Sequence, residues 1–181
     1  MNNNGRHTLV GIVRDRPGVL NRVVSLFRRR GFNIESIAVG PSEDLGIYRV
    51  TIGVIGSDAE VEQVRKQWEK VIDVVRVLDI TAEPMVTREL AFIKVKATGA
   101  TRSEIIQIVD IFRANIIDVA SDSFTIEVTG DDDKLQSLFN LLRGFGIKEI
   151  ARTGRLAMTR GASGPLKVED QENGKSRTPP N

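Results

Sequence analysis

The order of strand-like and helix-like patterns in this sequence predicts an α+β fold in which one βαββαβ unit occurs twice. Apolar residues alternate with a period of two in the strand segments and recur every three or four residues in the helical segments. The resulting order, which is that of the ferredoxin-like motif, occupies residues 1–80 and returns in residues 89–160. Between them, residues 81–88 break the pattern at Pro84 and are predicted to form a linker.

The first unit opens with a β-branched, apolar strand that a Pro-Gly pair terminates at Gly18. Helical periodicity begins directly after it, and Gly31 ends that helix. Ser57 and Glu60 have the spacing of a capping box at the start of the second helix, whose apolar stripe includes Trp68 and is expected in the core. The predicted elements are strand 7–14, helix 19–30, strand 33–39, strand 47–55, helix 59–71 and strand 74–80.

The second unit repeats this order after the linker. Thr101 and Glu104 have the spacing of another capping box before a helix with a regular apolar stripe. The acidic run Asp131–Asp133 precedes the next helix, where capping and the helix dipole favour acidic residues, so a metal site is not expected there. The other predicted elements are strand 90–97, the strand pair 116–121 and 124–129, helix 134–143 and strand 147–152.

The domains are small, at about 75 residues each, and domains of that size gain stability from further burial, which favours oligomerisation. From Gly161 onward the apolar content falls and Gly, Ser, Pro, Glu and Lys dominate. Such a segment does not bury enough surface to offset its ordering entropy, so residues 161–181 are predicted to be a disordered tail.

Composition excludes several classes of function. The chain has 181 residues, no cysteine and one histidine, His7, so thiol chemistry, disulfides and multi-histidine metal sites are excluded. Basic and acidic residues are balanced along the chain, with Arg28–Arg30 as the only basic cluster, so a nucleic-acid partner is not expected. The N-terminus lacks signal or transit character and no apolar run approaches the ~18 residues of a membrane span, so we expect a cytoplasmic protein without membrane contact.

The loop at Gly18 is the strongest candidate for a binding site. It places the amides of Gly18, Val19 and Leu20 at a helix N-terminus, where unpaired N–H groups and the helix dipole favour a carboxylate. Asp15 precedes the loop and either accepts a ligand ammonium or ties its own turn. Asn33 either donates to the ligand or starts the second strand. The loop thus predicts a site for a small anionic metabolite, although a Pro-Gly turn before a helix also has a purely structural use.

These residues resemble a known family. The series Asp15-x-Pro17-Gly18-x-Leu20, followed by Asn33-Ile34, resembles the opening of an ACT domain, the small amino-acid-sensing module. The run from Phe27 to Pro41 is similar to the regulatory small subunit of acetolactate synthase (acetohydroxyacid synthase), and the likeness extends over about residues 6–161. Further matching segments are Arg49–Ile52, Val71–Val74, Arg88–Leu90, Ile111–Arg113, Ile116–Val119 and Arg152–Gly154.

The resemblance implies a site shared between two chains. In the family, two ACT domains pair side by side and the amino acid lies at their interface. Carried over to this sequence, one chain would contribute Asp15, Gly18, Val19 and Leu20, and its mate would contribute Asn33 and Ile34. Some family members carry asparagine in place of Asp15; an anionic side chain there suits the ligand ammonium better than its carboxylate.

The resemblance also implies a non-catalytic chain that works with a partner. It would form a homodimer and bind valine or another branched-chain amino acid. It would raise the activity of a large catalytic subunit in branched-chain amino acid biosynthesis and confer feedback inhibition on it. Thiamine diphosphate, magnesium and FAD are expected only on that catalytic subunit, so no cofactor is expected on this chain.

Three other interpretations remain open or are disfavoured. A stand-alone amino-acid-sensing ACT regulator differs from the leading interpretation only in its partner. An acylphosphatase-like hydrolase would use Gly18-Val19-x-x-Arg22 as a phosphate loop, but Arg22 is also expected as an ordinary solvated helix residue. RNA recognition on the sheet is disfavoured because the strand 47–55 offers Tyr48 as its single aromatic residue.

Overall fold

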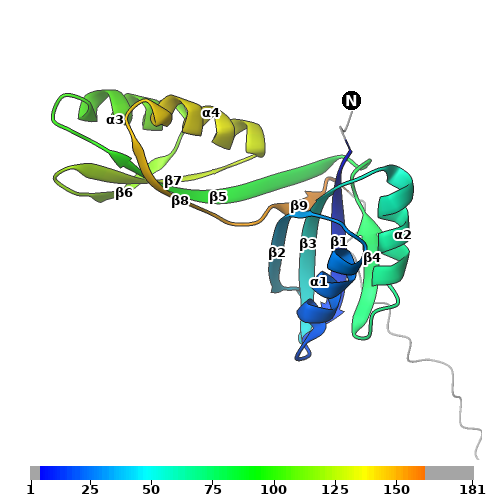
Figure 1. Ribbon diagram of the computed structural model, residues 1–181. Coiled ribbons are helices and arrows are strands. Elements are labelled where there is room, and N and C mark those ends of the chain that lie inside the picture. Colours follow the sequence, from blue (N-terminus) through cyan, green and yellow to red (C-terminus); the bar gives the residue numbers. More distant parts are fainter. Residues whose placement is uncertain (1–4, 162–181) are drawn as a thin grey trace, which may run out of the picture.

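The computed structural model describes residues 5–161, which form two α+β domains, each with an antiparallel sheet covered by two helices (Figure 1). The predicted fold class is confirmed. Within the predicted tail, residues 162–181 lie outside the described part of the chain.

The N-terminal domain contains a four-stranded sheet in the order β2-β3-β1-β4. Its elements are β1 (Arg6–Arg14), α1 (Val19–Arg29), β2 (Ile34–Pro41), β3 (Ile47–Ile55), α2 (Asp58–Trp68) and β4 (Val74–Asp79). All six were predicted, with ends that differ by up to three residues. The predicted capping box is confirmed: Ser57 Oγ accepts from the Glu60 N–H, and the Glu60 carboxylate accepts from the Ser57 N–H at 3.0 Å.

The core of this domain lies between the sheet and the two helices. Trp68 is fully buried there and meets Phe27 edge-on, with ring centroids 5.5 Å apart. The indole lies directly over Gly11 in β1, where an added Cβ would be 2.3 Å from a ring carbon of Trp68. Trp68 is therefore a core residue, as its place in the helical stripe predicted, and its size requires a glycine beneath it.

The C-terminal domain has the same topology, with the sheet order β6-β7-β5-β8. Its elements are β5 (Met85–Lys96), α3 (Arg102–Ile111), β6 (Asn115–Val119), β7 (Ser123–Gly130), α4 (Asp132–Arg143) and β8 (Ile147–Arg152). The capping box predicted at Thr101 is wrong: the Thr101 hydroxyl bonds within its own turn, accepting from the Thr98 N–H at 3.0 Å. Asp131 caps α4 by accepting from the Lys134 N–H at 3.0 Å, as the capping interpretation of the acidic run predicted.

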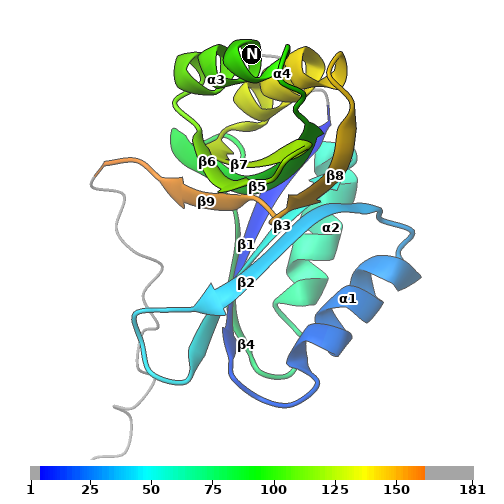
Figure 2. The same ribbon diagram turned by 90° about the vertical axis from the view of Figure 1, so that its left-hand side faces the viewer.

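A two-stranded ribbon joins the domains. The segment expected as a linker overlaps β5, which begins at Met85 and extends through both parts of the molecule (Figure 1). The first four residues of β5 pair with β9 (Leu156–Thr159), a strand that was not predicted. Ala157 in β9 packs with Val10 and Ile80 in a separate small core on the sheet face away from the helices. Figure 2 shows β9 on that face, with α1 and α2 on the other side of the sheet.

Candidate effector site

The loop between β1 and α1 turns at Gly18, which has φ +81° and ψ 0°. An L-residue with a Cβ loses about 1–2 kcal/mol in this left-handed conformation, whereas glycine adopts it readily. A Cβ added to Gly18 would have one heavy atom of the described residues within 4 Å, Arg22 Nη1 at 3.4 Å. The backbone of the loop is therefore open to a ligand at the start of α1.

Two of the three amides considered above are free to bind an anion. The Val19 N–H donates to Arg16 O at 3.2 Å within the loop itself. In contrast, the N–H groups of Gly18 and Leu20 have no hydrogen-bond partner within residues 5–161. Unpaired amides in the first turn of a helix, together with the helix dipole, favour a negatively charged ligand group.

A cavity of about 390 Å³ lies beside this loop. The side chain of Asp15 is exposed at its edge, and the Asp15 N–H fixes the loop by donating to Gly46 O at 2.8 Å. The cavity thus combines apolar walls, one carboxylate and two free amides, which suits a small zwitterion with an apolar side chain. Its lining residues are Val13, Arg14, Asp15, Arg16, Gly18, Val19, Leu20, Asn21, Val39 and Tyr48.

The six residues predicted for the site fall into two groups within one chain. Asp15, Gly18, Val19 and Leu20 line the cavity, whereas Asn33 and Ile34 do not. Strand pairing explains the separation. Ile34 pairs with Val54 at one end of β3, while Pro41, at the other end of β2, pairs with Tyr48 beside the cavity. A single chain therefore holds only the loop part of the predicted site.

Arg22 has a specific partner, contrary to the expectation of a solvated helix residue. Its Nη2 lies 2.6 Å from Asp73 Oδ2, and its Nε is buried without a hydrogen-bond partner among the residues described. Asp73 has φ 71° and its carbonyl accepts from the Arg14 N–H at 2.8 Å. The pair ties the first turn of α1 to the end of β1. This partner also competes with the phosphate-binding role that an acylphosphatase would require of Arg22.

Strand β2 is an edge strand with an apolar border. Four apolar side chains from α1 and β2 are each about two-fifths exposed along this edge: Leu20, Val24, Ile37 and Val39. The pairs Ile37–Ile52 and Val39–Val50 join residues on one sheet face, and Ile52 and Val50 belong to the core under the helices. Exposed apolar residues next to an unpaired strand edge are typical of a surface that pairs with another chain.

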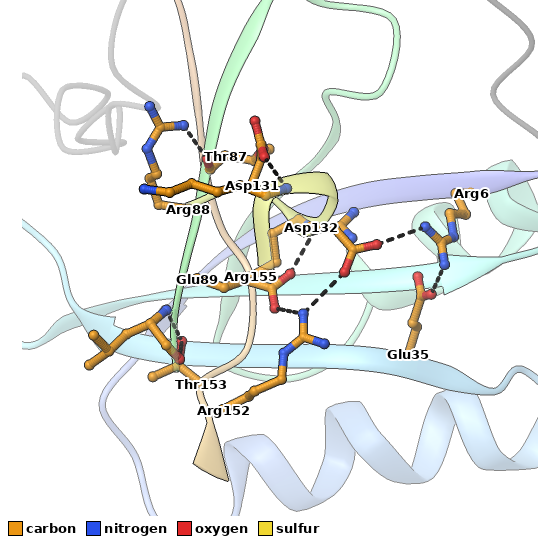
Figure 3. Close-up of polar contacts among 12 residues, drawn as sticks. Arg6, Glu35, Thr87, Arg88, Glu89, Asp131, Asp132, Arg152, Thr153 and Arg155 are labelled. Atoms are coloured by element: carbon orange, nitrogen blue, oxygen red, sulfur yellow. Dashed lines mark hydrogen bonds and ion pairs between the residues drawn. The ribbon is translucent and has the colours of Figure 1, made fainter. Parts of the chain in front are cut away.

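An ion-pair cluster lies where the domains meet (Figure 3). Glu89, in β5, is only 7% exposed. Its carboxylate binds Arg152 Nη2 at 2.5 Å and lies 3.5 Å from Arg155 Nε. Arg152 also contacts Asp132, the first residue of α4, at 3.1 Å. A carboxylate this buried needs such cationic partners, so the cluster fixes the start of α4 to β5 and β8.

The N-terminal domain reaches the cluster through Arg6. Its guanidinium lies 2.6 Å from Glu35 in β2 and 3.5 Å from Asp132 across the domain boundary. Burial raises the pKa of the Asp132 carboxyl, but hydrogen bonds from Arg152 and Gln136, with the charges of Arg152 and Arg6, outweigh it and hold that pKa below its ordinary value. The carboxylate of Asp132 therefore interacts with cations of both domains, Arg6 and Arg152.

The C-terminal domain repeats the topology of the N-terminal domain but has no counterpart of its Gly18 loop. The ends of α1 and α3 correspond. Gly31 and Arg113 both have positive φ, and the N–H of the residue after each donates back to a helix carbonyl. The next two residues are Asn-Ile in both domains, at 33–34 and 115–116. Where the first domain has its open Gly18 turn, the second has residues 98–101, which bond to one another through their threonines. The repeat therefore retains the strand edge and has no positive-φ glycine at the start of its first helix.

Sequence reasoning missed Val39 and Tyr48 in the cavity wall. Both are ordinary strand residues by pattern, and they reach the loop only because β2 and β3 end beside it in the folded sheet. Pairing of the predicted strands in ferredoxin-like order was the signal that places them there.

Two kinds of feature are absent from residues 5–161. In that range, no group of three or more acidic or histidine side chains is arranged to hold a metal ion. None of the helices formed by those residues is long and apolar enough to cross a membrane.

Comparison with known proteins agrees with this architecture. A family model described as the AHAS small subunit-like ACT domain matches residues 9–76, and one described as the small subunit of acetolactate synthase matches residues 88–161. The chain is 53% identical over 156 residues to a probable acetolactate synthase small subunit of Archaeoglobus fulgidus, covering 86% of this chain and 98% of that one. It is 49% identical over 158 residues to the acetolactate synthase small subunit of Mycobacterium bovis, covering 87% and 94%.

A solved structure extends the similarity to three dimensions. The crystal structure of the acetolactate synthase small subunit from Thermotoga maritima superposes with a TM-score of 0.80 at 43% identity, and the match covers 86% of this chain and 98% of that one. The resemblance inferred from the sequence motifs is confirmed over both domains. The chain belongs to the acetolactate synthase small subunit family, and its N-terminal domain is an ACT domain of that family.

Proposed function

We propose that this chain is a regulatory subunit that activates a large catalytic subunit of acetolactate synthase and makes it sensitive to feedback inhibition by valine. The observation that carries the proposal is the Gly18 loop, with two free amides beside an apolar cavity. Thiamine diphosphate, magnesium and FAD would belong to the catalytic subunit. The small subunits among the relatives support the partner, and the loop supports the amino-acid ligand.

The cavity accounts for each part of a valine molecule. The ligand carboxylate would accept from the Gly18 and Leu20 amides. Its ammonium would lie near the exposed carboxylate of Asp15. Its branched side chain would contact Val39 and Tyr48, which line the wall. Isoleucine and leucine share this chemistry. Valine is the member of the branched-chain class that we propose as the preferred ligand.

A homodimer would complete the site. If two copies of β2 pair antiparallel along their free edges, the start of one strand lies beside the end of the other. Asn33 and Ile34 of the second chain would then reach the cavity beside Val39. The same two residues of the first chain lie at the other end of β2, away from its cavity. The pairing would also cover the exposed apolar border of α1 and β2.

The direct test combines binding with activity. Calorimetry of the purified chain against valine, isoleucine and leucine should give the tightest binding for valine. The chain alone should produce no acetolactate, and adding it to the catalytic subunit should raise activity in a valine-inhibited manner. Valine binding without any effect on, or association with, the catalytic subunit would instead identify a stand-alone regulator. Turnover of acyl phosphate by the chain alone would identify a hydrolase.

Replacing Ile37 with lysine is expected to convert the dimer to monomers. Ile37 lies in the middle of the free edge strand, and in a symmetric pair each substitution acts twice, placing two uncompensated cations in the interface. Sedimentation velocity should show a monomer, and valine binding should be lost because each site needs two chains. The matched control is Ile150→Lys on β8, an edge residue of similar exposure in the other domain, which should remain dimeric. A dimeric Ile37→Lys chain would contradict pairing through β2.

A further inference from the structure

The segment 153–157 lies directly on the backbone of β2. A Cβ added to Gly154 would be 2.0 Å from Ile37 O and 2.9 Å from Ala38 N, so no side chain fits between this segment and the strand. Farther along, Arg49 Nη2 in β3 donates to Ala157 O at 2.8 Å. Ala157 is itself only 5% exposed. The segment is therefore packed closely against the outer face of β2 and β3.

The same strand forms part of the candidate effector site. Val39 lines the cavity from the opposite face of β2, two residues from the carbonyl that Gly154 contacts. Strand β2 also carries the free edge at which the second chain would bind. Any change in the position of β2 on ligand binding would therefore act on Gly154 through backbone contact, without a flexible side chain to absorb it.

The other end of the segment is fixed to the C-terminal domain. The Thr153 N–H donates to Leu90 O at 3.0 Å, and the Leu90 N–H donates to Thr153 Oγ1 at 3.0 Å. The preceding residue, Arg152, binds Glu89 and Asp132 and so reaches the start of α4 (Figure 3). Residues 152–157 thus connect β2 to both β5 and α4.

We propose that residues 153–157, the coupling segment, transmit occupancy of the effector site to the C-terminal domain through the contact of Gly154 with β2. The proposal rests on the proposed function and adds the route of regulation to it. Ligand bound beside Val39 holds β2 in one position relative to the second chain, and the coupling segment carries that position to β5 and α4. A ligand shifts such an equilibrium only by the difference in its affinity for the two positions.

The test uses the full chain with Gly154→Ala, whose added methyl group forces the coupling segment away from β2. The residues that line the cavity are unchanged, so the dissociation constant for valine should stay within about twofold of that of the unmodified chain. The reconstituted holoenzyme should lose its valine inhibition while the small subunit still activates it. Hydrogen exchange gives a second readout: valine should slow exchange of the Thr153 amide in the unmodified chain and leave it unaltered in the variant.

Two further variants separate coupling from general damage. Gly99→Ala adds the same methyl group in the turn before α3, where no described atom lies within 4 Å, so it should behave like the unmodified chain. Arg49→Met removes the hydrogen bond to Ala157 without a steric clash, so it should weaken the valine response even if Gly154→Ala folds poorly. Full valine inhibition in a folded Gly154→Ala or Arg49→Met holoenzyme would overturn the coupling segment. Failure of the unmodified chain to bind valine would overturn the proposed function, and the coupling with it.

Discussion

Replacing Gly18 with aspartate is expected to abolish valine binding and feedback inhibition while leaving activation of the catalytic subunit largely intact. The new carboxylate would occupy the position where the ligand carboxylate meets the amides of Gly18 and Leu20, so the ligand meets both steric exclusion and like-charge repulsion. The backbone adds strain, because φ +81° is unfavourable for any residue with a Cβ. Calorimetry and inhibition curves with the reconstituted holoenzyme measure the loss.

Gly18→Ala is the matched control for this variant. Its backbone strain at this φ is at least as large, because aspartate tolerates the left-handed conformation better than alanine, but it adds no charge. Its Cβ meets a single atom near 3.4 Å, Nη1 of Arg22. If the free amides bind a carboxylate, alanine should weaken valine binding and aspartate should eliminate it. Equal effects of the two substitutions would mean that the loop matters only for folding.

A mixed dimer tests whether the site spans two chains. Asn33→Ala removes a proposed donor to the ligand, and the loss of a charge-assisted hydrogen bond costs about 1.5–3 kcal/mol, or roughly tenfold or more in affinity. Pairing a Gly18→Asp chain with an Asn33→Ala chain places both changes in one site and leaves the other site unmodified. One of the two sites should then bind valine normally. Damage to both sites would show that each is built within a single chain.

Replacing Gly11 with alanine should lower the free energy of unfolding of the N-terminal domain. The added methyl carbon would lie 2.3 Å from a ring carbon of Trp68, which is fully buried against Phe27 and the sheet. The indole is fully buried and can move only by displacing its neighbours, and overpacking of this kind costs typically about 1–3 kcal/mol, sometimes more. Trp68 is the only tryptophan in the chain, so its fluorescence reports unfolding of this domain specifically.

The control for this prediction is again Gly99→Ala, which adds a methyl group in a turn with no described atom within 4 Å. Its melting temperature should match that of the unmodified chain. An unchanged melting temperature for Gly11→Ala would show that the indole repacks freely, and that the glycine is not required by the size of Trp68.

Hydrophobic periodicity was sufficient to predict most of the fold, because each regular element buries a face that its own sequence specifies. It failed for β9 and for the start of β5. Those residues mix polar and apolar side chains, and their pairing partners lie far away in the sequence, as Met85 and Thr159 show. The pairing of β5 with β9 can be inferred only once Val10 and Ile80 are known to form an apolar outer face of the first sheet that another segment must bury.

The candidate site was likewise predictable from the sequence only in part. Glycine at position 18 was identifiable because a Pro-Gly pair directly precedes helical periodicity and a family motif contains it. The pairing of Arg22 with Asp73 was not identifiable, since both residues have ordinary local explanations and meet only where the first turn of α1 lies beside the residue that precedes β4. The coupling segment was not identifiable either, because the need for a glycine at position 154 arises only from its contact with the carbonyl of Ile37 in the folded chain.

The position of β9 in the chain has a consequence for synthesis. The last strand of the N-terminal sheet ends at Asp79, but the residue that covers its outer face, Ala157, is made nearly eighty residues later. At ribosomal rates of about 5–20 residues per second, that interval is on the order of 4–16 seconds. Throughout it, Val10 and Ile80 remain on an uncovered apolar surface of an otherwise complete sheet. Each nascent chain thus exposes this apolar surface until β9 leaves the ribosome.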